Sequence, residues 1–234
     1  MVSSTSKPSS QQLLCLARVG CNMSTASVAA AAVVAAMCGV PSTASAQTID
    51  VARFFAGAAV GLGIHESAHL IADEAYGANP GVRKVSAGFI PFFAITHEPV
   101  TPVKEFTISS AGFWAQEVGS EVLLSRRPNL HDEHAPMLKG LLAFNVVTSV
   151  IYAGAAFIQR GPAERDTRGM AFSAGVDEPW IGASVLAPAI LDAARYYRPD
   201  SRVLRWASRA AKVGGAMLIF KAVGTGGQVA EANR

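Results

Sequence analysis

Cysteine is scarce in this sequence and occurs only near the N-terminus. Its three cysteines are Cys15, Cys21 and Cys38. We expect residues 1–46 to be a secretory signal, because an apolar run there ends in the small-x-small sequence Ala44-Ser45-Ala46. The mature chain would then contain no cysteine, which excludes disulfides and thiolate metal ligands. Any metal would be held by histidine and carboxylate side chains.

Two alternatives to this signal stay open. The apolar run from Val28 to Met37 could be an anchor helix that is not removed, and Met23 could also be the first residue. In either case the cysteines lie ahead of the segments discussed below.

Charged residues are also few. Asp, Glu, Lys and Arg make up 16% of the 234 residues, whereas half of the residues are apolar. This balance is typical of a small polytopic membrane protein, whose main partner is the lipid bilayer. The net charge of +3 is small and dispersed, and the sequence has no basic patch interleaved with aromatic residues. No nucleic-acid partner is therefore expected.

Hydrophobic segments recur through the mature chain. They cover about residues 51–76, 106–124, 137–158 and 180–197, with a shorter run at 213–223. Residues 82–102 are rich in strand formers punctuated by glycine and proline, which predicts a small β-hairpin or re-entrant loop. Residues 159–179 are charged and glycine-rich and predict a loop. We therefore expect an all-α polytopic membrane helical bundle of four to five segments over 47–225, with a disordered tail at 226–234.

The first hydrophobic segment contains His65-Glu66-Ser67-Ala68-His69. On a helix, residues four apart share a face, so His65 and His69 can offer imidazole nitrogens to one metal ion. Glu66 follows the first histidine and could polarise a metal-bound water as a general base. Ionisable residues in an apolar span are unfavourable unless they have a function, which favours a zinc site. The alternative is a histidine pair whose hydrogen bonds are made by neighbouring helices.

These features resemble the site-2 protease family of intramembrane zinc metalloproteases. The resemblance covers roughly residues 51–198 and begins with the His-Glu-x-x-His motif and the extended loop after it. The sequence Ser-Ala-Gly-Phe-Trp-Ala at 110–115 is similar to an Ala-Gly-Pro-like turn of the family, without the proline. The sequence Pro-Ala-Ile-Leu-Asp-Ala-Ala-Arg at 188–195 resembles the family's Leu-Asp-Gly motif, with alanines replacing glycines. The resemblance implies Asp192 as the third zinc ligand and relates Asn145 to an asparagine of the family.

The third ligand has alternatives among the carboxylates. Glu117, in the second hydrophobic segment, would give a His-His-Glu set, and Glu121 one turn further could orient a histidine. If residues 137–158 cross the membrane completely, the next helix returns and carries Asp192 to the side opposite the histidines. A break at Pro188 would remove this conflict.

The resulting expectation is a zinc-dependent intramembrane endopeptidase that cleaves a membrane-anchored protein segment. His65, His69 and Asp192 would bind zinc, and Glu66 would move the proton. The resemblance implies that the substrate helix unwinds locally. The alternative function is a non-proteolytic integral membrane protein that keeps the metal site for structural or metal-handling purposes, and a membrane protein without metal is a third possibility.

The expected location is a bacterial inner membrane, with the N-terminus outside. The motif would then lie toward the cytoplasmic side. Basic residues Arg83, Lys84 and Lys104 bracket the extended loop and favour a cytoplasmic position for it. Arg126 and Arg127, after the second segment, conflict with an external position for the loop that follows.

Overall fold

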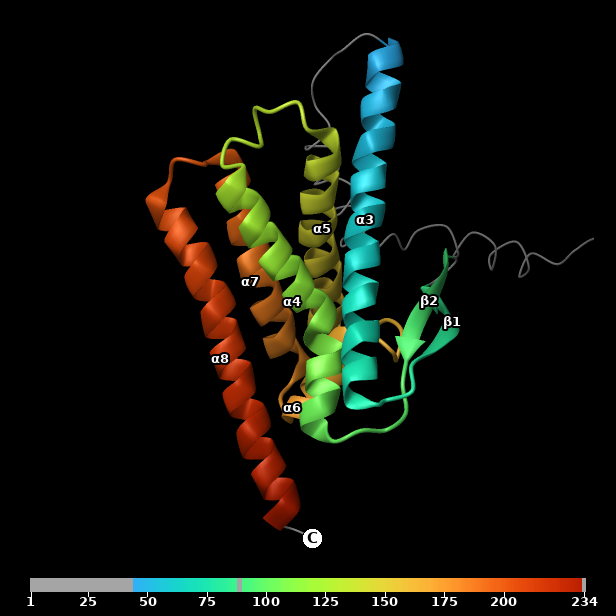
Figure 1. The fold of residues 1–234 in the computed structure, drawn as a ribbon. Helices are drawn as coiled ribbons and strands as arrows, with labels where there is room; N and C mark the ends of the chain where they lie inside the picture. Colours follow the sequence, from blue (N-terminus) through green and yellow to red (C-terminus); the bar gives the residue numbers. More distant parts are fainter. Residues whose placement is uncertain (1–43, 88–89, 233–234) are drawn as a thin grey trace, which may run out of the picture.

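The protein is mostly helical, with one small sheet (Figure 1). The structure, a computed structural model, describes residues 44–87 and 90–232, so the expected signal lies almost entirely outside the described residues. The helices are α3 (Ala44–Tyr76), α4 (Pro102–Arg126), α5 (Pro136–Ile158), α6 (Asp166–Ala174), α7 (Glu178–Tyr197) and α8 (Arg202–Ala232). Strands β1 (Gly81–Ala87) and β2 (Ile90–Thr96) pair antiparallel, with Gly81 opposite Thr96. The expected helical architecture and the hairpin after the first helix are both present.

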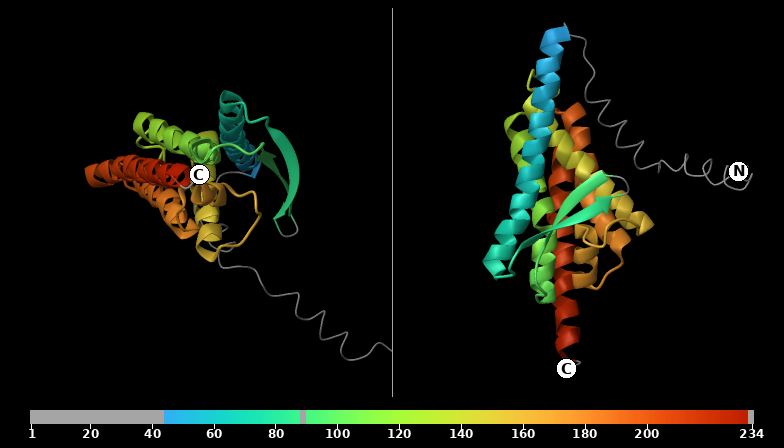
Figure 2. Two further views of the ribbon diagram at one scale, coloured as in Figure 1. Left: turned by 90° about the horizontal axis from the view of Figure 1, so that it is seen from below. Right: turned by 90° about the vertical axis from the view of Figure 1, so that its right-hand side faces the viewer.

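The five long helices lie alongside one another and alternate in direction (Figure 1). The C-terminal end of α3, the start of α4, the end of α5 and the start of α7 therefore meet at one end of the bundle. Helix α6 lies at this same end, and the hairpin extends beside the lower half of α3 (Figure 2). We call this end of the bundle the α6 end. The loops from α4 to α5 and from α7 to α8 lie at the opposite end.

Two expectations differ from the observed elements, and one alternative is not found. Residues 159–179, expected to be a loop, contain α6. Helix α7 runs through Pro188 as one element, so the break that would have removed the conflict over Asp192 is absent. Helix α8 continues to Ala232, so most of the segment expected to be a disordered tail is helical.

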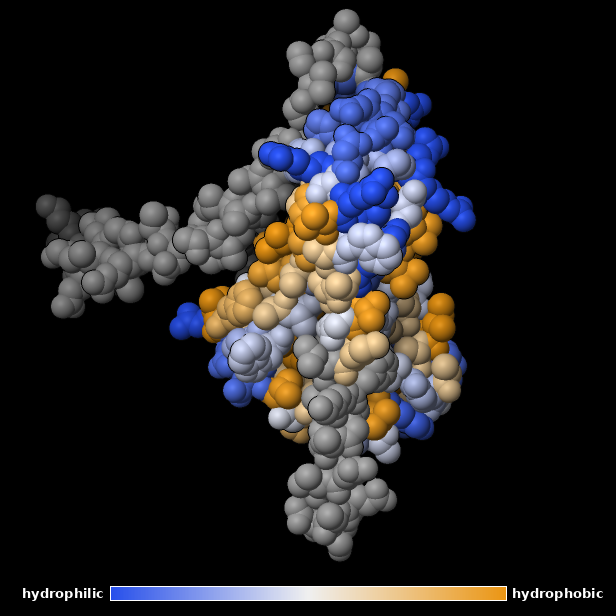
Figure 3. All heavy atoms as spheres, turned by 90° about the vertical axis from the view of Figure 1, so that its left-hand side faces the viewer, coloured by the Kyte–Doolittle hydropathy of each residue, from blue (hydrophilic) through white to orange (hydrophobic). Residues whose placement is uncertain are grey.

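Two helices among the described residues are long and apolar enough to cross a membrane. They are residues 47–76 of α3 and the whole of α5, and only 22% and 39% of their most apolar stretches are buried within the protein. The expected four to five spans are thus not confirmed. On the face that carries α8, hydrophilic residues gather toward the end opposite α6, and hydrophobic residues lie next to them toward the middle (Figure 3). Exposed apolar surface of this kind is typical of a face that another protein or a membrane covers.

Close contacts at glycine join α3 to α5. A Cβ atom added at Gly57 would collide with the backbone carbonyl of Met137, and one added at Gly140 would collide with that of Phe54. Small residues of this kind let two helix backbones approach, a packing mode common between membrane helices. This contact fixes α5 along α3, so the chain leaves α5 close to the histidine motif.

An apolar cluster holds α6 against α4 and α7. Its buried members are Phe106, Phe113, Met170, Ala171, Ala174, Ile181 and Val185. Burial of an aromatic or aliphatic side chain of this size stabilises the fold by about 1.5–3 kcal/mol. The short helix is therefore fixed in place, although nine residues alone would not form a stable helix in water.

Candidate metal centre

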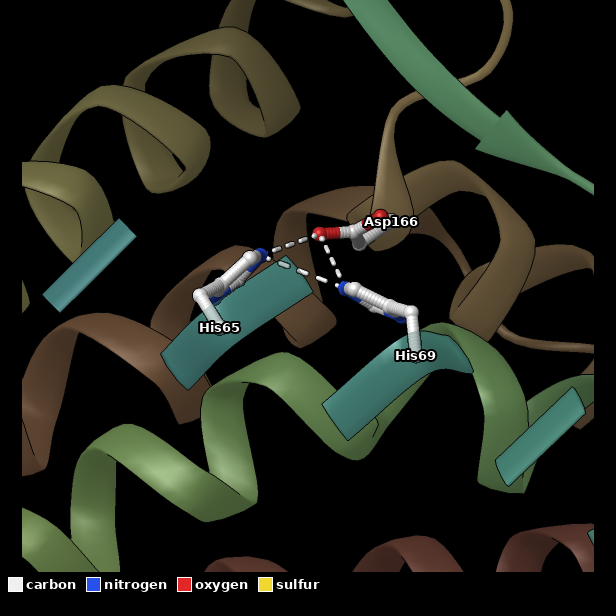
Figure 4. Close-up of side chains that lie close together, drawn as sticks. All are labelled: His65, His69 and Asp166. Atoms are coloured by element: carbon white, nitrogen blue, oxygen red, sulfur yellow. Dashed lines mark hydrogen bonds and ion pairs between the residues drawn. The ribbon is translucent and has the colours of Figure 1, made fainter. Parts of the chain in front are cut away.

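Three side chains converge at the α6 end of the bundle (Figure 4). His65 and His69 extend from α3, and Asp166 is the first residue of α6. The two histidine Nε2 atoms are 3.2 Å apart, and the Asp166 Oδ2 atom lies 3.2 Å from that of His65 and 3.5 Å from that of His69. Around a tetrahedral zinc with bonds of about 2.0–2.1 Å, neighbouring ligand atoms are roughly 3.3 Å apart. The three atoms thus fit three corners of such a tetrahedron, and a fourth corner remains.

The orientation of His69 is fixed by its other ring nitrogen. Nδ1 lies 2.8 Å from the backbone carbonyl of Ile108, and because a carbonyl can only accept, Nδ1 must donate. In a neutral ring Nε2 then carries a lone pair, and it faces His65 Nε2 at 3.2 Å and Asp166 Oδ2 at 3.5 Å. This is the form of the imidazole that can bind a metal ion. This hydrogen bond from the second nitrogen to a carbonyl is also the usual arrangement behind a metal-binding histidine.

Asp166 is held in its ionised form. Burial alone would raise the pKa of Asp166, but hydrogen bonds with His65 and His69, and their Coulombic attraction, hold this pKa well below its usual range. Its position at the first turn of α6 adds the favourable field of the helix N-terminus. An ionised carboxylate is the form that binds a metal ion.

A buried ion pair beside Asp166 fixes the start of α6. Arg165 donates to both carboxylate oxygens of Glu178 at 2.6 and 2.5 Å, and the Thr167 hydroxyl donates to the same carboxylate at 2.8 Å. Arg165 and Glu178 are each less than 10% exposed. The residues on either side of Asp166 are thus bound to the first residue of α7, which limits how far its carboxylate can move.

Helix α4 approaches His65 at a glycine. A Cβ atom added to Gly112 would come within 3.0 Å of the His65 ring. The adjacent Phe113 packs its ring edge-on against the same imidazole, with 5.6 Å between centroids. Gly112 belongs to the sequence at 110–115 discussed above, and its contribution here is the space it leaves for the imidazole.

The site opens into a cavity of about 490 Å³. Glu66 lines it together with both histidines and Asp166, so the carboxyl group of Glu66 adjoins the same space. Apolar side chains from α4 and α5 and residues 94–97 at the end of the hairpin form much of the remaining wall. The volume is typical of a site for a small molecule or a short peptide segment.

Asp192 is not brought to the histidines. It lies in the last part of α7, where its carboxylate accepts from Ser208 at 2.6 Å and pairs with Lys212 at 2.8 Å and with Arg195 at 3.5 Å. The reason is the direction of the helices, because α5 runs the full length of the bundle and α7 starts at the α6 end. Asp192 therefore lies in the opposite half of the bundle. The carboxylate beside the two histidines is Asp166, and not the expected Asp192.

The alternative carboxylates are also engaged elsewhere. Glu117 lies 3.7 Å from Lys212, and Glu121 pairs with Arg195 and Arg209 at 2.5 and 2.7 Å. Asn145 donates to the Ser120 hydroxyl and the Gln116 carbonyl within the bundle, away from the metal site. None of these three residues belongs to the group of side chains that could hold a metal ion among the described residues.

Asp166 was missed because the segment that contains it reads as a charged loop. The order and direction of the helices could have pointed to Asp166. A helix that starts at the far end of the bundle and crosses it completely must end near the histidines, so a carboxylate in the next few residues becomes a candidate ligand. Asp166 lies eight positions after the last residue of α5, Ile158.

Comparison with known proteins found no match that bears on the function of this site. The chain matches no protein-family model, no curated protein and no solved structure. The residues and geometry of the site itself are the basis for assigning a function.

Proposed function

We propose that this protein is a zinc-dependent endopeptidase that cleaves a membrane-anchored protein segment within or beside the bilayer. The observation that carries the proposal is the spacing of the three ligand atoms of His65, His69 and Asp166, with Glu66 in the same cavity. Three protein ligands of the nitrogen and oxygen type, with one corner left over, are typical of catalytic zinc sites. Structural zinc sites instead use four protein ligands, often cysteines.

The residues of the chain have distinct roles in this reaction. Bound zinc would polarise the substrate carbonyl and lower the pKa of a water molecule. Glu66 accepts the proton of the attacking water and delivers it to the nitrogen of the leaving amine. Tyr152 lines the cavity from α5, its ring 6.2 Å from that of His65, and its hydroxyl interacts with Asp166. With a metal bound to Asp166, this hydroxyl could turn and donate to the oxyanion that develops on the carbonyl.

A position inside the membrane agrees with the two apolar helices. We propose that α3 and α5 cross the bilayer. His69 lies seven residues before Tyr76, the last residue of α3, or roughly 10 Å along the helix axis. The metal site would then lie just below one membrane surface, where the hairpin borders the cavity. The basic residues around the hairpin favour the cytoplasmic surface of a bacterial inner membrane, with the N-terminus outside.

The test is Glu66→Gln in the full-length protein, purified in detergent. We expect wild-type protein to cleave fluorescently labelled β-casein, and the variant to lose roughly 10²- to 10⁴-fold in rate while its zinc content stays unchanged. Glu74→Gln is the matched control, because Glu74 is an exposed acid on the same helix. Activity that survives Glu66→Gln would contradict the proposal. Stoichiometric zinc in a wild-type protein that cleaves nothing would favour the non-proteolytic alternative.

A further inference from the structure

A second group of polar residues lines the same cavity. Asp73 follows His69 by four residues and therefore lies one turn further on the same face of α3. Its side chain is fully buried, and neither carboxylate oxygen has a hydrogen-bond partner among the described residues. Because an ionised carboxylate is strongly unfavourable when buried alone, the ionised form of Asp73 depends on a positively charged or hydrogen-donating group. Its place in the cavity wall lets a ligand supply that group.

Glu105 and His97 adjoin Asp73 in the cavity wall. The His97 Nδ1 atom donates to the backbone carbonyl of Glu98 at 2.8 Å, and its Nε2 atom lies 3.4 Å from Glu105 Oε2. The Ser109 hydroxyl donates to Glu105 Oε1 at 3.0 Å. Two carboxylates therefore face one histidine, and the group stays negative or at most neutral whichever form that histidine takes.

The arginine in the cavity wall is already paired. Arg165 is the only lysine or arginine among the described residues that line the cavity, and its guanidinium is held by Glu178. Glu164 also lines the cavity and is paired with Arg83. Glu105 has partners in His97 and Ser109, whereas the charge of Asp73 is left for a ligand to balance.

We infer that Asp73 and Glu105 form a subsite for a lysine or arginine side chain of the substrate, close to the bond that is cleaved. This inference rests on the proposed peptidase function and names a substrate class for it. Residues four apart on a helix have Cβ atoms about 6 Å apart, which sets the separation between the subsite and His69. In an extended peptide each residue advances about 3.4 Å, so the basic residue lies one or two positions from the scissile bond.

The apolar part of the cavity suits the rest of such a side chain. Ile95 and Ile108 line the cavity together with the acidic pair. Lysine and arginine carry three or four methylene groups that favour apolar contact, with the charge only at the tip. The subsite therefore offers contacts for both parts of the side chain.

A binding experiment tests the subsite independently of turnover. The full-length Glu66→Gln variant is loaded with zinc in detergent, and two fluorescein-labelled peptides are compared by anisotropy. They are alanine- and leucine-based decapeptides that differ only in a central lysine or norleucine. We expect the lysine peptide to bind roughly 10- to 100-fold more tightly, since a charge-assisted hydrogen bond contributes about 1.5–3 kcal/mol.

Two further substitutions in the same background identify the group responsible. Asp73→Asn should remove the preference for lysine and leave binding of the norleucine peptide within about twofold, in line with the loss of charge-assisted contacts alone. Glu74→Gln, at the exposed neighbouring acid, should keep the preference. Equal binding of the two peptides by the parent protein would overturn the inference, and so would a preference that survives Asp73→Asn.

The failure of this subsite and the failure of the peptidase function are distinguishable. A preference for lysine without β-casein cleavage by wild-type protein would support the subsite and contradict the peptidase. Cleavage without enrichment of lysine or arginine near the cut sites, mapped by mass spectrometry, would contradict the subsite alone. Two zinc ions per wild-type chain, falling to one in Asp73→Asn, would assign the group to a second metal and also overturn the inference.

Discussion

Gly112→Ala tests the placement of the metal site against α4 without changing any proposed ligand. The added Cβ atom would come within 3.0 Å of the His65 ring, so the ring or the helix must move. Overpacking of this kind destabilises by about 1–3 kcal/mol. If His65 turns away to relieve the contact, zinc affinity should fall by roughly 5- to 150-fold, since 1.4 kcal/mol corresponds to a factor of ten.

The matched control is Gly119→Ala on the same helix. A Cβ atom at Gly119 would meet only the Asn145 amide, at 4.0 Å, so it fits without movement. Alanine is favoured over glycine within a helix by about 1 kcal/mol, and this control should therefore gain stability and keep its zinc affinity.

Two measurements separate these variants. Zinc affinity is determined by competition with a chromophoric chelator, and the stability of the metal-free protein by thermal unfolding followed by circular dichroism. The reasoning is refuted if Gly112→Ala binds zinc as tightly as Gly119→Ala and is equally stable, because His65 would then not pack against α4.

Three other substitutions probe the parts that support the site. Glu178→Gln leaves Arg165 buried without its carboxylate; we expect a loss of about 3–5 kcal/mol in denaturant unfolding and a 10- to 100-fold loss of zinc affinity. Gly140→Leu forces a side chain into the Phe54 backbone and should destabilise by at least about 1–3 kcal/mol, which unchanged unfolding would disprove. Tyr152→Phe removes a hydroxyl that interacts with Asp166 and could serve the oxyanion; it should lower turnover of β-casein by roughly 10²- to 10³-fold at saturating zinc, and unaltered turnover would show that Tyr152 takes no part in the reaction.

The histidine motif and the helices could be read from the sequence because their signals are local. His65 and His69 lie four residues apart within a continuous apolar run, and this spacing alone places both on one helix face. The hairpin was expected from strand-forming residues between glycines and prolines. Each of these inferences uses residues that are close together in the chain.

The third candidate ligand could not be found in this way, because its position depends on how the helices are arranged. Asp166 lies 97 positions after His69 in a segment with a polar, loop-like composition. Its helix α6 is stabilised by tertiary contacts with α4 and α7, which helix propensity does not report. Only the complete crossing of α5 shows that this segment returns to the histidines.

Asp192 was expected as the third ligand because residues 188–195 resemble the Leu-Asp-Gly motif of the site-2 protease family. The structure gives it another role, since Asp192 and Glu121 face the cationic side chains of Arg195, Arg209 and Lys212 between α4, α7 and α8. These charges are paired across the helices and attach α8 to the bundle. A short motif that resembles a family's ligand sequence is thus not by itself evidence for a metal ligand.

Zinc content is the most direct test of the central claim that His65, His69 and Asp166 form the metal site. It is measured by plasma mass spectrometry on purified wild-type protein and on two matched variants, Asp166→Asn and Asp192→Asn, each checked for folding by circular dichroism. We predict one zinc per chain in wild type and in Asp192→Asn, and a large loss in Asp166→Asn. Zinc retained in Asp166→Asn and lost in a folded Asp192→Asn would contradict the account.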